Sequence, residues 1–221
     1  MSKSTFSAEL LPASTPEPTV YIVDDDPAIC DAIASLLDVQ GFRTQSFVSG
    51  KAFLEVCSPG LQGCILLDLC LPDYSGLDVL HALADRGVTA PVIILTGHGT
   101  IQSSSEAFRH GAFDYLEKPF QGQALLQRVI EALHQDERRR LKDLQKLAVS
   151  ERYARLSERE REVLRFVVTG FSSKEMAKHM GISHRTVEIY RAHVMRKMGS
   201  DTLVDLLRTV TPFVDDSGEL H

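Results

Sequence analysis

Short apolar runs alternate with helix-length amphipathic stretches between Thr19 and about Gly122. The runs read VYIV, RTQSF, CILLD, PVIILT and FDYLE. Runs such as CILLD and PVIIL are apolar throughout, as expected of parallel strands that helices cover on both faces. Strands separated by helices in this way build a doubly wound sheet. The rhythm therefore predicts an α/β domain with a five-stranded parallel sheet.

Polar residues follow four of these runs where each run ends: Asp24, Asp25 and Asp26 after the first, Asp68 after the third, Thr96 after the fourth and Lys118 after the fifth. Ligands of doubly wound sheets bind at this edge. Carboxylates gathered there repel one another unless they are protonated or share a cation, and such oxygen ligands suit Mg²⁺. The metal would neutralise charge during phosphoryl transfer, with Lys118 and Thr96 on the transferred group's oxygens.

Each of these residues also has a simpler interpretation. The three aspartates could cap a helix, Thr96 could be a plain strand residue and Lys118 a solvated lysine before Pro119. Because complementary groups follow four different strands, a single phosphoryl site explains them better than four unrelated roles.

The rest of the chain has a helical pattern. We expect a flexible N-terminal segment at 1–18, the α/β domain at 19–135, a helical linker at 136–152, an all-helical domain at 153–213 and a flexible tail at 214–221. In the helical domain, Ser157 and Glu160 form a capping-box pattern. Gly170 and Gly181 should end helices, and Ser183 should cap one.

Charge is divided unevenly along the 221 residues. Residues 1–125 carry 6 Lys and Arg against 15 Asp and Glu, a net charge of −9, whereas residues 171–200 carry 6 against 2, a net charge of +4. This asymmetry suggests that the two parts have different partners.

The four cysteines show no metal-ligand spacing and look like small hydrophobic residues in a reducing compartment. The start has no signal-peptide pattern, and no run approaches the roughly 20 apolar residues needed to span a bilayer. We expect a cytoplasmic protein without a membrane partner.

Four motifs, VYIVDDDP, LLDLCLPDYSG, IILTGHG and AFDYLEKPF, resemble the receiver domain of bacterial two-component response regulators. The resemblance implies that a sensor histidine kinase phosphorylates Asp68 and that Mg²⁺ lies among Asp24, Asp25, Asp68 and the backbone carbonyl of Cys70. It also implies that Thr96 and Lys118 sense the phosphoryl group, that Tyr115 is the aromatic switch, and that the Lys118–Pro119 peptide is cis.

The segment from Leu156 to Gly199 resembles the LuxR-type helix-turn-helix, so the whole chain resembles FixJ/NarL-type transcriptional regulators, nearer FixJ. At 100° per residue, one side of the third helix of this domain is apolar and the other polar or small, as a major-groove helix requires. The core side holds Val187, Tyr190, Val194 and Met198. The expected DNA-binding residues are Lys174, Arg185, Thr186, Glu188, Ile189, Ala192 and Arg196.

These features predict a phosphorylation-switched regulator, not an enzyme, that binds double-stranded DNA, works with RNA polymerase and forms a homodimer when phosphorylated. The dimer surface would include the fourth receiver helix, near 101–112, where IQSSSEAFRHGA is less aliphatic than in FixJ-like chains. One alternative is a receiver joined to a protein-interaction module, which the +4 segment argues against. The other is a phosphohydrolase of the haloacid dehalogenase type, whose motif needs Thr or Val where Ala28 stands.

Overall fold

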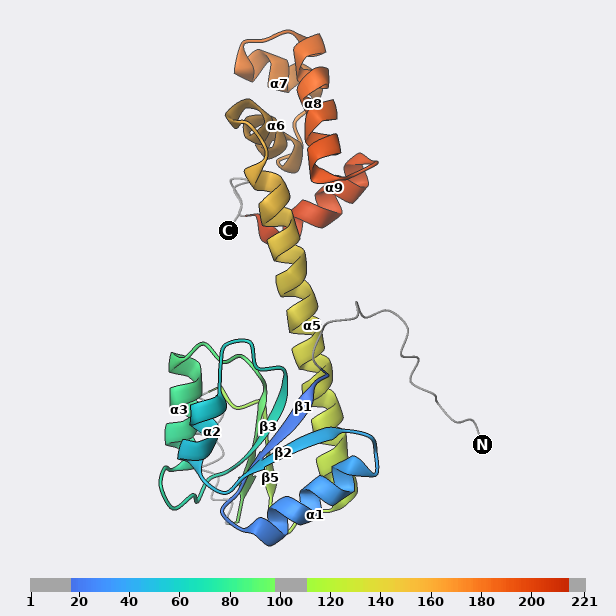
Figure 1. Ribbon diagram of the computed structural model, residues 1–221. Helices are drawn as coiled ribbons and strands as arrows, with labels where there is room; N and C mark the ends of the chain where they lie inside the picture. The colour runs from blue at the N-terminus through green and yellow to red at the C-terminus, as the bar shows by residue number, and fades with distance from the viewer. Residues whose placement is uncertain (1–16, 98–110, 215–221) are drawn as a thin grey trace, which may run out of the picture. The chain divides into compact units, whose positions relative to one another are not determined.

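The computed structural model describes residues 17–97 and 111–214 (Figure 1). The chain divides into a first unit that ends at Arg139 and a second unit that starts at Arg140. The predicted fourth receiver helix and nearly all of the two predicted flexible ends lie outside the described residues.

The first unit is built on a five-stranded parallel sheet in the order β2-β1-β3-β4-β5, which confirms the predicted fold class. The strands are β1 (Thr19–Val23), β2 (Arg43–Phe47), β3 (Gly63–Asp68), β4 (Val92–Thr96) and β5 (Asp114–Glu117). The helices described in this unit are α1 (Pro27–Asp38), α2 (Gly50–Val56), α3 (Gly76–Asp85) and the first part of α5 (Gly122–Ala154).

Helices cover both faces of the sheet, as the continuously apolar runs predict. Figure 1 shows α2 and α3 together on one face, and α1 with the start of α5 on the other. Each face has its own core, one around Phe53, Leu67 and Leu83, and one around Leu37 and Leu125. All six residues of β3 are buried, so the charge of Asp68 lies at the end of a fully enclosed strand.

The start of β3 is fixed by a close approach and by a buried carboxylate. Gly63 has φ +119°, and a Cβ there would lie 1.9 Å from the carbonyl oxygen of Thr19. Asp136 on α5, 1% exposed, accepts a 3.0 Å hydrogen bond from the Gly63 N–H and pairs with Arg139. The first part of α5 is thereby tied to the strand that carries Asp68 at its other end.

The second unit is helical. It contains the end of α5, α6 (Glu158–Val168), α7 (Ser173–Met180), α8 (His184–Met198), α9 (Leu203–Val210) and the 3₁₀ turn η1 (Thr211–Phe213). The Ser157–Glu160 capping box and the Ser183 cap are confirmed. Gly170 and Gly181 both have positive φ just after a helix, as predicted.

Helix α5 runs unbroken through the predicted linker, and its last turns belong to the core of the second unit. Val149 near the end of α5 and Leu156 just after it are each 3% exposed and pack in the same cluster as Val163 and Val194. The predicted limit at residue 135 lies inside α5, and the limit at 153 lies one residue before its last residue, Ala154.

A buried carboxylate joins α6 to α8. Glu160 accepts hydrogen bonds from the Ser157 N–H (2.7 Å) and from Nζ of Lys197 (2.6 Å). Burial by itself would raise the pKa of Glu160, but the hydrogen bonds from Lys197 and Ser157 outweigh it and lower the pKa to about 2.

We predict that Glu160→Gln lowers the melting temperature of the second unit near neutral pH, because the amide loses the charge that pairs with Lys197. A carboxyl group whose pKa is lowered by folding stabilises the fold above its unfolded pKa, and this is lost as pH falls toward the folded pKa. The difference between wild type and variant should therefore shrink as pH falls from about 5 to about 2. Calorimetry at several pH values measures it, with the exposed Glu151→Gln as the control; a difference that does not change with pH would contradict the assignment.

Candidate functional site: a lysine between two aspartates, and the exposed face of α8

Three charged side chains meet at the carboxyl edge of the sheet. Nζ of Lys118 lies 2.6 Å from Oδ2 of Asp24 and 2.8 Å from Oδ1 of Asp68. Asp24 is 0% exposed and Asp68 is 5% exposed. The sheet order makes this possible, because β1 and β3 are neighbours and Lys118 directly follows β5. The structure thus brings together three residues that the sequence placed at separate strand ends.

Backbone groups hold the other oxygen of each carboxylate. Oδ2 of Asp68 accepts from the Cys70 N–H at 2.9 Å, and Oδ1 of Asp24 accepts from the Asp26 N–H at 3.1 Å. The Lys118 N–H donates to the carbonyl of Thr96 at 2.7 Å, and the peptide after Lys118 is cis, as predicted. Each charged group is therefore fixed at both ends.

The loop after Asp68 turns tightly because Gly76 allows it. A Cβ at Gly76 would lie 2.4 Å from the carbonyl oxygen of Asp68. Ser75 and Asp78 form a capping box at the start of α3, and Ser75 pairs with Cys70 in an isolated β-bridge. Gly76 of the motif LPDYSG thus lets the chain return to the end of β3.

The remaining predicted residues of this edge differ in exposure. Thr96, at the end of β4, is 5% exposed, whereas Tyr115 on β5 is 40% exposed. Asp25 is exposed, as is Cys70. Asp26 takes the simpler role considered for it, since its side chain caps α1 by accepting from the Ala28 N–H.

The surroundings of Lys118 stabilise its protonated form. Burial alone would lower the pKa of Lys118, but the hydrogen bonds to Asp24 and Asp68 outweigh it and raise the pKa above its ordinary value. One ammonium group faces two carboxylates, so the edge keeps a net negative charge.

The donor chemistry of this edge fits Mg²⁺. Carboxylate oxygens with residual negative charge are the ligands that this cation prefers. Within the described parts of the chain, however, no three acidic, His or Cys side chains are arranged to hold a metal ion. Asp24 and Asp68 converge on Lys118, and Asp25 lies exposed beside them, so the predicted ligand set is only partly assembled.

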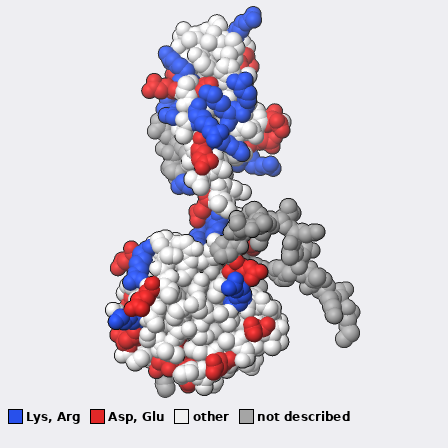
Figure 2. Space-filling model, in the orientation of Figure 1, with Lys and Arg blue, Asp and Glu red and all other residues white. Residues whose placement is uncertain are grey.

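A second candidate surface is the exposed face of α8. Val187, Val194 and Met198 are at most 1% exposed and Tyr190 is half-buried, which confirms the predicted core side. The opposite side is exposed and carries Arg185, Glu188, Ile189, Ala192 and Arg196. Lys174 on α7 is also exposed, and Thr186 is half-buried. Lys and Arg side chains gather over α8 on the visible face of the second unit (Figure 2).

Sequence reasoning missed the contacts that hold α8 in place. Lys197 donates to Glu160, and Arg152 on α5 donates to the carbonyl of Met198 at 3.0 Å. Arg152 fell within the predicted linker. The sequence offers only a weak signal for it, a basic residue near a helix end.

Comparison with known proteins identifies the two units of the chain. Residues 20–130 match the response regulator receiver domain, and residues 154–210 match the bacterial regulatory proteins of the luxR family. The chain is a two-component response regulator of the FixJ type. It joins a receiver domain to a LuxR-type DNA-binding domain and is a regulator of transcription.

Similar proteins cover nearly the whole chain. The transcriptional regulatory protein FixJ of Azorhizobium caulinodans is 40% identical over 90% of this chain and 92% of its own length. The response regulator protein TodT of Pseudomonas putida is 37% identical over 90% of this chain and 88% of its own.

Two solved structures share the arrangement of the elements. The response regulator StyR has a TM-score of 0.78 at 31% identity, covering 90% of this chain and 100% of its own. Full-length FixJ from B. japonicum has a TM-score of 0.56 at 35% identity, covering 94% of this chain and 100% of its own. None of the helices in the described ranges is both long and apolar enough to cross a membrane.

We predict that Lys118→Met lowers the free energy of unfolding of the response regulator by about 1–3 kcal/mol near neutral pH, because two buried carboxylates lose their charged donor. A lysine whose pKa is raised by folding stabilises the fold below its unfolded pKa of 10.5, and this is lost as pH rises through the higher folded pKa. The deficit should therefore shrink above about pH 10.5. Urea titrations at several pH values measure it. The exposed Lys51→Met should cost far less, and equal losses would contradict the role of Lys118.

Proposed function

We propose that Asp68 accepts a phosphoryl group from a sensor histidine kinase and that this modification switches DNA binding. The observation that supports the proposal is the Lys118 ammonium held between Asp24 and Asp68 at the carboxyl edge of the sheet. A carboxylate kept at a strand end with a cation at its oxygen is suited to attack phosphorus and to keep the product's charge compensated.

In the proposed reaction, one carboxylate oxygen of Asp68 attacks the phosphorus of the kinase's phosphohistidine. A phosphorus–oxygen bond forms, the phosphorus–nitrogen bond breaks, and the imidazole leaves. Mg²⁺, when held by Asp24, Asp25, Asp68 and the Cys70 carbonyl, supplies positive charge for the phosphoryl oxygens. Lys118 exchanges a carboxylate contact for one with the product, and the Thr96 hydroxyl donates to it.

The proposed switch follows from the positions of Thr96 and Tyr115. A phosphoryl group can change the DNA-binding unit only if it favours one of two arrangements over the other. Movement of Thr96 toward the product would let the half-exposed Tyr115 turn inward and reshape the surface of β5. Two receiver domains would then associate there, and the homodimer would bind double-stranded DNA in the cytoplasm and act on RNA polymerase.

We predict that Asp68→Asn abolishes labelling by acetyl phosphate in the presence of Mg²⁺, because an amide cannot act as the nucleophile. Asp26→Asn is the matched control, since Asp26 only caps α1 and asparagine caps helices equally well. The control should be labelled like wild type. Stoichiometric labelling of Asp68→Asn would refute the assignment.

Sedimentation of the same proteins extends this experiment to the switch. Phosphorylated wild type should shift from monomer toward dimer, and Asp68→Asn under the same conditions should not. If labelled wild type stays monomeric at concentrations that saturate its DNA site, dimerisation is not part of the switch.

The exposed face of α8 is proposed to enter the major groove. Its exposed residues combine two arginines, one acidic side chain and the small Ala192, which lets the helix approach base edges closely. Residues in the N-terminal part of a recognition helix contact base edges, and Glu188 lies in that part of α8, whereas Arg196 near its other end is suited to a phosphate contact. Lys174 and Thr186 would contact the DNA backbone beside it.

We predict that Arg196→Ala weakens binding to every DNA sequence and lowers the slope of the salt dependence by about one, as expected for one lost phosphate contact. Glu188→Ala should keep the slope and relax base preference, because a carboxylate accepts from cytosine. Salt titrations and selection from random DNA measure the two effects. Arg208→Ala, whose side chain is 82% exposed on α9, is the control and should change neither. An unchanged selected motif for Glu188→Ala would count against its place in the groove.

A further inference from the structure

The C-terminal end of α8 is held by a side chain of α5. The last carbonyl groups of a helix have no partner within the helix. At α8, the backbone N–H groups of Gly199 and Ser200 satisfy two of them. The carbonyl of Met198 instead accepts a 3.0 Å hydrogen bond from a terminal guanidinium nitrogen of Arg152.

The turn that follows α8 lies against this guanidinium. Gly199 has φ +66°, the left-handed conformation that ends the helix. A Cβ at this position would lie 3.4 Å from the terminal nitrogen of Arg152 that makes the bond. The left-handed turn that ends α8 therefore favours glycine, and it places the guanidinium of Arg152 in van der Waals range of this position.

A second bond ties the same turn of α8 to the chain just after α5. Nζ of Lys197 donates to Glu160 at 2.6 Å and to the carbonyl of Arg155 at 3.2 Å. Arg161 on α6 in turn donates to the carbonyl of Ala154, the last residue of α5. Side chains thus link the ends of α5 and α8, and the last turn of α8 cannot shift along its axis without breaking at least one link.

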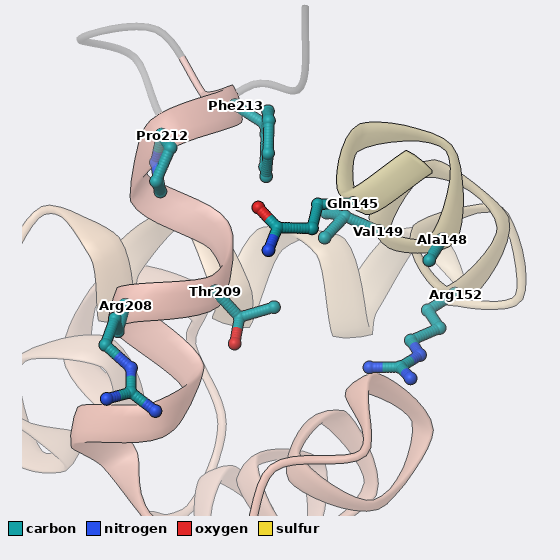
Figure 3. A pocket seen from close by; sticks show the side chains of 8 residues that line it. All are labelled: Gln145, Ala148, Val149, Arg152, Arg208, Thr209, Pro212 and Phe213. Carbon is teal, nitrogen blue, oxygen red and sulfur yellow. The ribbon is translucent and has the colours of Figure 1, made fainter. Parts of the chain in front are cut away.

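Packing on the other side of α5 is incomplete. A cavity of about 510 Å³ separates its last turns from α9 and η1, and Arg152 is part of its wall (Figure 3). Gln145 and Thr209 point toward one another across this space, with Phe213 beside them.

We infer that Arg152 is a positioning residue for DNA recognition: it acts through the Met198 carbonyl to fix the C-terminal end of α8, and so the placement of the residues that read bases. The inference rests on the proposed role of α8 as the helix that enters the major groove. Arg152 itself contacts no base in this account, so its loss should reduce specific binding more than non-specific binding.

The test compares full-length Arg152→Met with wild type on a DNA site selected by the wild-type protein and on random DNA. Met keeps the aliphatic length and removes the donor. We expect about threefold to tenfold weaker binding to the selected site, the effect of one lost hydrogen bond. Binding to random DNA and the slope of the salt dependence should stay as in wild type.

Arg161→Met is the matched control. Arg161 also donates to a helix-end carbonyl in the second unit, but that carbonyl belongs to α5 and not to α8. Its loss should lower the melting temperature by a similar amount and leave the preference for the selected site unchanged. Should Arg152→Met fail to fold, Arg152→Gln and Arg152→Lys carry the test: Lys, which keeps a charged donor of similar reach, should bind the selected site more tightly than the shorter Gln.

Several results would overturn the inference. Equal losses on selected and random DNA, with a salt slope lower by about one, would make Arg152 a phosphate contact. Unchanged specificity in a less stable Arg152→Met, or equal affinities of the Gln and Lys variants, would leave only a structural cap. If wild type itself did not prefer its selected site, the proposed function would fail and this inference with it. Normal wild-type specificity with an unaffected variant would overturn this inference alone.

Discussion

The ammonium group of Lys118 determines what the carboxyl edge of the sheet can do. Asp24 and Asp68 are almost completely buried, and a carboxylate enclosed in this way without a partner destabilises a fold by several kcal/mol. One cation compensates for both, and it can do so because the parallel sheet brings the ends of β1 and β3 together beside the residue that follows β5. A charged group added to Asp68 would compete for Lys118, and this would couple the proposed chemistry at Asp68 to residues at the ends of three strands.

In the second unit, too, charged side chains fix the position of a functional element, here helix α8. Burial of Val187, Val194 and Met198 decides which face of α8 points inward. Apolar contacts are not directional, however, so they tolerate small rotations and shifts of the helix along its axis. Hydrogen bonds from Lys197 to Glu160 and from Arg152 to Met198 are directional, and they act at one end of α8. Core packing thus sets which face of α8 is exposed, and the hydrogen bonds of the charged side chains set the position of α8 along its axis.

Much of this architecture could be predicted from the sequence, because it depends on patterns within a few residues. Continuous apolar runs identified strands covered on both faces, and the end of CILLD identified Asp68 as a charge at a strand end. The Ser157–Glu160 box was recognisable because its partners are three residues apart. The separation of Asp25 from the buried pair was not predictable, since its exposure depends on the conformation of the chain after β1.

The contacts that sequence reasoning missed join residues far apart in the chain. Arg152 lies 46 residues from Met198, and Lys197 lies 37 from Glu160. A long charged side chain at a helix end looks the same in sequence whether it is solvated or bonded, and only the packing of other elements decides between these outcomes. The charge-dense stretch DERRRLKDLQK was therefore predicted to be a helical linker, and the sequence did not show that the same helix continues to Arg152, which holds the end of α8. The last turns of α5 belong to the DNA-binding unit and not to a linker, because Val149 packs in its core and Arg152 bonds to the end of α8.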